Sequence, residues 1–330
     1  MSTNSIFQDP RLAWMKNPDI RPYVFVRPEN RVDQPGKLHK QLDWFPHKVI
    51  YKNPLEMDQV AFADRILNLE ARAFGPSGMA MPRWVFYDCA IVPGFVAGFA
   101  ARASSLSPTA RAALMPETAD DPPNVATPAI HAPDEWVPLS LFIIIPTMSQ
   151  NGEWVAHNLC SVNSLLPKED GYQGIGFLSK AFGLWYANVR TCCGMTQWTS
   201  PAVRLHAHYG DFEVLTAYTP VHSYARTLTY RVEVDTTAWP HFFGKGGLLS
   251  AAGTQAATAK YESAGFSVDP KDEASLISFQ RRLEKREGPF YIDGNETMAR
   301  ALSEPLTIFR KRSGFSPSPS VVNLLKCRDD

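Results

Sequence analysis

The residues best suited to chemistry form a glycine-rich turn in the middle of the chain. The turn, residues 171–176, reads Gly-Tyr-Gln-Gly-Ile-Gly and lies between an apolar stretch that ends at Leu166 and another that begins at Phe177. A strand that leads through such a turn into a helix leaves backbone N–H groups unpaired at the positive end of the helix dipole. Glycines let a ligand approach because they carry no side chain. The pattern indicates a phosphate or diphosphate site, although three glycines before a helix also occur for structural reasons alone.

Candidates for proton transfer lie on the segment before the turn. Alternation along residues 153–163 places Glu153 and His157 on one face of a predicted strand and Cys160 on the other. Glu153 and His157 are therefore the candidates to take a proton from a substrate, directly or through water. The structural alternative is a surface glutamate and a half-buried histidine that is hydrogen-bonded for stability. Opposite faces argue against a nucleophilic pair of Cys160 and His157.

Other polar groupings favour no second site. His206 and His208 diverge on a helix, and no cysteine or carboxylate has the spacing to complete a metal site, so we predict no metal. A rival glycine-rich loop at 244–247 precedes residues 261–266, which read Tyr-Glu-Ser-Ala-Gly-Phe. Too few residues separate these two segments to hold a helix, a strand and another helix. We interpret the rival loop as one that closes over the first turn.

The composition excludes several classes of protein. The 330 residues include 33 lysines and arginines against 33 aspartates and glutamates, so no overall field attracts nucleic acid or an anionic membrane. The five scattered cysteines are typical of free thiols, which favours the cytoplasm. No signal-like amino terminus or apolar run long enough to span a bilayer is present in the sequence.

The elements that position these residues follow from hydrophobic periodicity and turn residues. We expect an amino-terminal arm over 1–46, a core over 47–235 with an insertion at about 104–136, and a carboxyl-terminal extension over 236–330. The expected strands are 47–52, 84–92 with 95–102 as a hairpin, 136–146, 153–166, 195–199, 213–221 and 227–235. The expected helices are 56–74, 176–189, 201–209, 254–263 and 273–287. This order predicts an α/β (α+β) fold with a mixed, mostly antiparallel central sheet.

Residues 200–214, which read Ser-Pro-Ala-Val-Arg-Leu-His-Ala-His-Tyr-Gly-Asp-Phe-Glu-Val, make the pattern more specific. Together with the glycine turn and the order of elements, they resemble the GCN5-related N-acyltransferase (GNAT) family over about residues 137–235. The resemblance implies a pair of parallel strands, 153–166 and 195–199, that splay apart and expose backbone to a pantetheine arm. It also implies transfer of an acyl group from acyl-CoA, such as acetyl-CoA, to a small-molecule or peptide amine. Acyl carrier protein is the alternative donor.

The resemblance also assigns roles to residues. His206 stands where the family has the tyrosine that protonates the leaving thiolate, and Tyr209 would lie at the substrate. Trp198 is most simply a core residue, but its place near the parting of the two strands would also let it line an acyl tunnel at the substrate. The diphosphate would be held by Leu165, Gly171, Tyr172, Gln173, Gly174, Ile175, Gly176, Phe177 and Leu178.

The chain departs from the family pattern at three points. Gly171 replaces an arginine or glutamine, His206 replaces the tyrosine, and Asp211 is an extra residue between a glycine and a phenylalanine. These departures leave open a second hypothesis, a catalytically degenerate GNAT-fold binding or scaffolding module. A cysteine–histidine hydrolase is a third. A homodimer is compatible with each of them.

Overall fold

The computed structural model describes residues 10–30, 48–114, 132–147, 152–221, 224–234, 260–294 and 304–312. These residues form two compact units. The first unit contains the described residues up to Pro146 and residues 155–189. The second contains Thr147, residues 152–154 and the described residues from Arg190 onward.

The first unit is built on a sheet with the strand order β6-β5-β3-β1-β2, and β4 also pairs with β3. Its strands are β1 (Ile20–Phe25), β2 (Ile50–Lys52), β3 (Phe95–Arg102), β4 (Trp136–Pro138), β5 (Ser140–Pro146) and β6 (Glu153–Ser161), of which residues 155–161 belong to this unit. Strand β3 runs antiparallel to β1, β4 and β5, whereas β1 and β2 are parallel. All residues of β3 except Arg102 are buried, as expected for a central strand rich in apolar residues.

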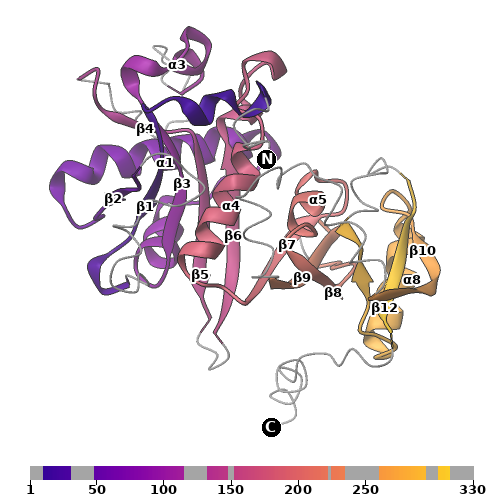
Figure 1. Ribbon diagram of the computed structural model, residues 1–330. Coiled ribbons are helices and arrows are strands. Elements are labelled where there is room, and N and C mark those ends of the chain that lie inside the picture. Colours follow the sequence, from indigo (N-terminus) through magenta and orange to yellow (C-terminus); the bar gives the residue numbers. More distant parts are fainter. Residues whose placement is uncertain are drawn as a thin grey trace, which may run out of the picture. The chain divides into compact units, whose positions relative to one another are not determined.

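Two helices, α1 (Val60–Phe74) and α4 (Ile175–Tyr186), pack on opposite faces of this sheet (Figure 1). On one face, Tyr23 of β1 meets Phe62 of α1 edge to face, with ring centroids 5.1 Å apart. On the other, Phe95 of β3 meets Tyr186 of α4 at 5.1 Å. Because side chains alternate along a strand, both faces of the sheet can be apolar and both can be covered by a helix.

Shorter helical segments complete the first unit. They are η2 (Pro10–Lys16), η3 (Pro28–Asn30), η4 (Met57–Gln59), η5 (Gly75–Ser77), α2 (Arg83–Val85), η6 (Phe86–Ile91), η7 (Ala103–Ser105), α3 (Pro108–Leu114), η8 (Val162–Ser164) and η9 (Lys168–Asp170).

The backbone of β5 comes unusually close to β3 at Gly98. A Cβ atom on Gly98 would lie 2.1 Å from the Ser140 carbonyl oxygen, which is far inside van der Waals contact. The same carbonyl accepts a hydrogen bond of 2.9 Å from the Tyr23 hydroxyl, and the Ser140 hydroxyl accepts one of 3.0 Å from the Phe99 amide. The absent side chain of Gly98 therefore permits this approach.

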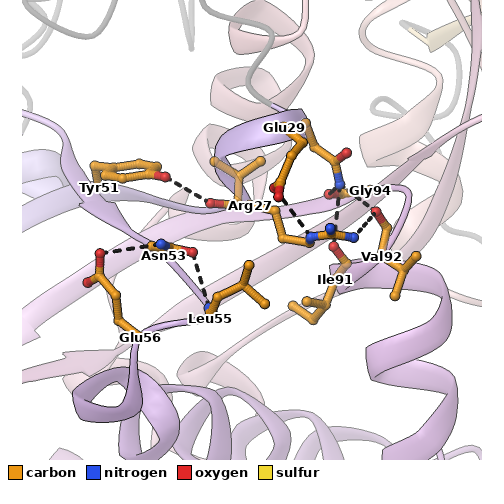
Figure 2. A network of polar contacts seen from close by, with 11 residues as sticks. Arg27, Glu29, Tyr51, Asn53, Leu55, Glu56, Ile91, Val92 and Gly94 are labelled. Atoms are coloured by element: carbon orange, nitrogen blue, oxygen red, sulfur yellow. Dashed lines mark hydrogen bonds and ion pairs between the residues drawn. The ribbon is translucent and has the colours of Figure 1, made fainter.

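Residues 20–30 belong to the body of the first unit, so the prediction of an arm or loop is wrong for them. Strand β1 lies between β3 and β2 in the sheet. Beyond β1, Arg27 pairs with Glu29 at 3.4 Å and donates to the Val92 carbonyl at 3.5 Å (Figure 2). The Asn30 side chain donates to the same carbonyl. These contacts fix the end of β1 to the end of the helix that precedes β3.

The second unit is an antiparallel sheet with the strand order β10-β12-β11-β8-β9-β7. Its elements are β7 (Thr191–Gln197), α5 (Ala202–His206), β8 (Gly210–Thr216), β9 (Thr227–Val234), β10 (Tyr261–Val268), α8 (Glu273–Glu284), β11 (Tyr291–Ile292) and β12 (Leu306–Lys311). Helix α8 begins at a capping residue, Asp272, whose carboxylate accepts from the Ala274 amide at 3.0 Å. Its Phe279 packs on the rings of Phe266 and Phe290, both at 5.5 Å.

Asp211 ties three strands of the second unit together. Its carboxylate lies 2.5 Å from the Lys260 ammonium and 2.9 Å from the Lys311 ammonium, and it accepts a hydrogen bond from the Tyr261 hydroxyl. Burial alone would raise the pKa of Asp211, but these donors bring it below its ordinary value. The residue that is extra relative to the family pattern thus has a structural role.

The fold class is confirmed: both units are mixtures of helices and strands, and the sheet pairing is mostly antiparallel. The predicted hairpin is wrong in its first arm, because residues 83–91 are helical. The helix predicted over 254–263 is wrong from Tyr261 onward, where β10 begins. Residues 254–259 lie outside the described residues, as do 244–247. The splaying of the strands 153–166 and 195–199 stays a prediction.

We expect Gly98→Ala to lower the free energy of unfolding by about 3 kcal/mol or more, because the added methyl group overlaps the backbone of β5. Gly75→Ala is the matched control, since a Cβ there would meet nothing within 4 Å. Urea unfolding followed by circular dichroism measures both variants. Equal stabilities of the two variants would contradict the packing described for Gly98.

Candidate functional site

The glycine turn leads directly into α4, and one side of it is open. Gly174 precedes the helix with a left-handed backbone (φ 77°), and its carbonyl accepts the Leu178 amide at 2.9 Å. A Cβ on Gly176 would meet nothing within 4 Å. Within the described ranges the Gly176 amide has no hydrogen-bond partner. The first turn of α4 therefore presents an N–H group and free space at the positive end of a 12-residue helix.

The other side of the turn is filled by Asn163, two residues after the end of β6. Its side-chain oxygen accepts the Tyr172 amide at 2.7 Å, and its nitrogen donates to the Tyr172 carbonyl at 2.8 Å. The Gly171 amide donates to the Lys168 carbonyl at 3.4 Å. The amides of Gly171 and Tyr172, predicted to hold a diphosphate, are thus engaged with the chain itself.

The remaining predicted turn residues differ in what they offer. The Leu178 amide is used inside the helix, and the Leu165 amide donates to the Val162 carbonyl at 2.8 Å. The Gln173 carbonyl accepts the indole N–H of Trp14 at 3.0 Å. The Ile175 amide donates to the Tyr172 carbonyl at 3.1 Å. The part of the turn that can receive an anion is therefore around Gly176, and the shape of the turn is held by Asn163 and Trp14.

A chain of polar side chains crosses from α1 to β6. Glu70 of α1 is 1% exposed, and its two carboxylate oxygens accept the Met81 amide at 3.1 and 3.0 Å. The Asn158 side-chain nitrogen donates to the same carboxylate at 2.7 Å. The Asn158 side-chain oxygen lies 3.0 Å from Nδ1 of His157. A carboxylate, an amide and an imidazole thus stand in one hydrogen-bonded series.

The sequence analysis missed Glu70. It lies four residues after Ile66 and three after Leu67, which are both buried, so it falls on the apolar face of α1. A carboxylate on the apolar face of a helix is a signal that could have found it. Its role becomes visible only with its hydrogen-bond partner on β6, Asn158, which is distant in the sequence.

Burial sets the protonation of this cluster. Burial raises the pKa of Glu70 to about 7, although the hydrogen bonds from Met81 and Asn158 act in the opposite direction. Burial, with a smaller contribution from the charge of Glu70, also raises the pKa of the Cys160 thiol well above its ordinary value. Cys160 is therefore a protonated thiol near neutral pH, which disfavours the hydrolase hypothesis.

Glu153, the other predicted base, belongs to the second unit, whereas His157 belongs to the first. Glu153 is 8% exposed, and its carboxylate accepts the Cys193 thiol with a sulfur–oxygen distance of 2.9 Å. Burial and this carboxylate raise the pKa of the Cys193 thiol. Because its carboxylate is buried and engaged by the thiol, Glu153 is less suited than the half-buried His157 to take a proton from a substrate.

The other predicted residues of the second unit are packed in its core. His206 stacks on Tyr230 with ring centroids 4.8 Å apart and is 5% exposed. Trp198 and Tyr209 are fully buried, and the Trp198 indole donates to the Ala217 carbonyl at 2.7 Å. These positions give all three residues a packing role, and their roles in catalysis or substrate binding stay predictions.

Among the residues that the structure describes, no three His, Cys, Asp or Glu side chains gather as metal ligands. None of the helices in the described ranges has the length and hydropathy needed to cross a bilayer.

We expect the raised pKa of Glu70 to make stability depend on pH. Between about pH 4.5 and about pH 7 the unfolded chain releases this proton while the folded chain keeps it, so stability falls as pH rises through this window. The loss is on the order of 3 kcal/mol. Glu70→Gln has no such proton and should become more stable relative to the native chain as pH rises.

Urea unfolding at about pH 5 and about pH 8 measures this difference. Glu169→Gln, a change at an exposed glutamate of the same unit, is the control and should leave the pH dependence unchanged. Identical pH profiles for the native chain and Glu70→Gln would contradict the assignment.

Comparison with known proteins adds little to this geometry. No family model matches the sequence. No curated protein matches it either. Among solved structures, the chain is similar to a proposed acetyltransferase of the GNAT family from Desulfovibrio desulfuricans, at 13% identity and a TM-score of 0.31, covering 54% of this chain and 95% of that one. A likeness this slight carries no argument about activity, which leaves the function to be argued from the residues of this chain.

Proposed function

We propose that the chain is an N-acyltransferase that binds a coenzyme A thioester at the start of α4 and transfers its acyl group to an amine. The observation that carries the proposal is the open Gly176 amide, with free space beside it, at the positive end of a helix. A diphosphate needs N–H donors and close approach to the backbone, and both are offered here. The order of elements around the turn, which resembles the GNAT family, supports coenzyme A as its carrier.

The geometry of the first unit also supports a path for the thioester arm. Asn163, just beyond β6, contacts the turn, so the strand leads from the turn toward His157. A strand rises about 3.3 Å per residue, which places His157 about 13 Å along β6 from its end at Ser161. An extended pantetheine arm that follows β6 from the turn would bring its thioester toward the imidazole.

The proposed reaction is aminolysis of a thioester. The amine nitrogen attacks the acyl carbon, a C–N bond forms, the C–S bond breaks, and the thiol leaves. Nε2 of His157 takes the proton that the nitrogen loses, and the departing thiolate accepts a proton, so the imidazole is regenerated when it gives its proton to the thiolate or to water. The products are an amide and free coenzyme A.

One observation favours the alternative of a binding module without catalysis. His206, the proposed donor to the thiolate, is stacked in the core of the second unit rather than presented at a surface. A chain that had lost catalysis could still bind the nucleotide at α4. The two hypotheses differ in turnover and agree on binding.

We expect coenzyme A, acetyl-CoA or a longer acyl-CoA to raise the thermal midpoint of the chain, because a ligand at 100 times its Kd adds about 2.7 kcal/mol to stability. Gly176→Glu should abolish the rise, since it places a carboxylate where the diphosphate would lie. Ser77→Glu introduces the same charge at an exposed position on another element and should keep the rise. No rise with any of these ligands would count against the proposal.

Turnover separates the enzyme from the binding module. Release of free thiol from acetyl-CoA in the presence of a panel of amines should be catalysed by the native chain and reduced by about 100-fold or more in His157→Gln. The thermal shift with coenzyme A should persist in this variant, because the imidazole acts on the acyl group and not on the diphosphate. A chain that binds but releases no thiol would be the binding module.

A further inference from the structure

We propose that Glu70 and Asn158 are positioning residues that fix the proton of His157 on Nδ1 and leave the lone pair of Nε2 available as a base. The role as a base rests on the function proposed above. The position of the proton does not, because it follows from the hydrogen bonds of the first unit alone.

The Glu70 carboxylate determines how the Asn158 amide is oriented. Above about pH 7 the Glu70 carboxylate is ionised and only accepts hydrogen bonds, so the NH₂ group of Asn158 must face it, at the 2.7 Å distance observed. The amide oxygen then faces the other way, toward His157. This contact removes the usual ambiguity about which end of an asparagine amide is oxygen and which is nitrogen.

The orientation of the Asn158 amide in turn determines which nitrogen of the His157 imidazole carries the hydrogen. The Asn158 oxygen has only lone pairs to offer to Nδ1 of His157, 3.0 Å away, so Nδ1 must carry the hydrogen. In a neutral ring with the proton on Nδ1, Nε2 holds a lone pair. A free imidazole side chain favours the opposite arrangement, with the proton on Nε2, so a histidine with this proton on Nδ1 indicates an acceptor that holds it there.

The Glu70 carboxylate can orient Asn158 because it is itself held in place. The Glu70 carboxylate is held from a second direction by the Met81 amide, and it extends from the buried face of α1. The titratable group that faces it from β6 is the Cys160 thiol, which stays protonated, and beyond that lies Tyr23 of β1, whose pKa is also raised by burial. No charged partner therefore competes with Asn158 for the carboxylate among the groups that act on it.

The series corresponds in logic to a carboxylate that orients a catalytic imidazole, with one amide inserted between them. The neutral amide of Asn158 brings no charge to the imidazole, and it affects only the orientation of the hydrogen bonds. Glu70 fixes which way Asn158 points, and Asn158 fixes which nitrogen of His157 is the base.

Nitrogen-15 NMR of the histidine side chains in the full chain tests the proposal, because the shifts of Nδ1 and Nε2 report which one carries hydrogen. The signals of His157 are identified by their loss in His157→Gln. Above neutral pH, where Glu70 is ionised, we expect the Nδ1–H form to predominate in the native chain. Asn158→Ala and Glu70→Ala should shift His157 toward the Nε2–H form.

Two further variants show whether the effect is specific. Asn158→Asp keeps an acceptor for Nδ1 and should retain the Nδ1–H form. Asn68→Ala removes a different buried polar side chain of α1, which donates to the Leu114 carbonyl, and should leave His157 unchanged. Asn68→Ala is expected to disturb α1 about as much as Glu70→Ala does, but it leaves the hydrogen bond between Glu70 and Asn158 in place.

A native chain with the His157 proton on Nε2 would overturn the proposal, and so would an unchanged tautomer in Asn158→Ala. The native measurement decides this even where a variant does not fold. Failure of the coenzyme A thermal shift with an Nδ1–H histidine would refute the proposed function and leave the positioning pair intact. A normal thermal shift with an Nε2–H histidine would refute the positioning pair and leave the proposed function intact.

Discussion

A buried carboxylate is the constraint on which the organisation of the first unit depends. Taking Glu70 out of water is costly unless its lone pairs are used, and the chain satisfies them with the Met81 amide after α1 and the Asn158 side chain of β6. The helix, the loop that follows it and a strand distant in the sequence are thereby held to one point. The cost of burial is visible in the raised pKa, which shows that the two donors offset desolvation only in part.

The glycine turn illustrates how a folded chain narrows what a sequence pattern offers. The six residues of the turn suggested a site lined by free backbone amides. Both polar atoms of the Asn163 side chain, however, hydrogen-bond to the backbone of Tyr172 and so fill one side of the turn. What is left is the Gly174–Gly176 side, where the helix begins. The asparagine has a second consequence, because it fixes the turn to the segment just beyond β6 and so connects the proposed ligand site to the strand that carries the imidazole.

Much of the fold could be predicted because local pattern and burial agree. Strands β3 and β5 and helix α4 follow from apolar runs of the right length bounded by glycine and proline. The run at 84–92 failed because a short apolar segment suits a buried helix as well as a strand, and only its packing decides. Residues 261–263 likewise read as the end of a helix but pair with β12. Pairing between distant segments cannot be read from local sequence.

The candidate site was predictable in its residue types and not in their roles. The turn and His157 could be proposed from the sequence because glycine before a helix and histidine on a strand are local signals, and their roles stay predictions. Glu70 was not found, since its meaning depends on Asn158, 88 residues away in the chain. His206 and Trp198 were assigned to catalysis and substrate binding, and these roles stay predictions. Their packing on Tyr230 and Phe279, which gives them a structural role, could not be read from the sequence.

The contact of Trp14 with the Gln173 carbonyl has a practical consequence. Trp14 supports the glycine turn through this hydrogen bond, and the strand that follows it, β1, lies inside the sheet. Trimming the chain back to its more regular middle, or fusing a bulky tag close to residue 14, would loosen the turn before any residue of the turn itself was altered. Preparations of this protein should therefore keep that segment intact and unencumbered.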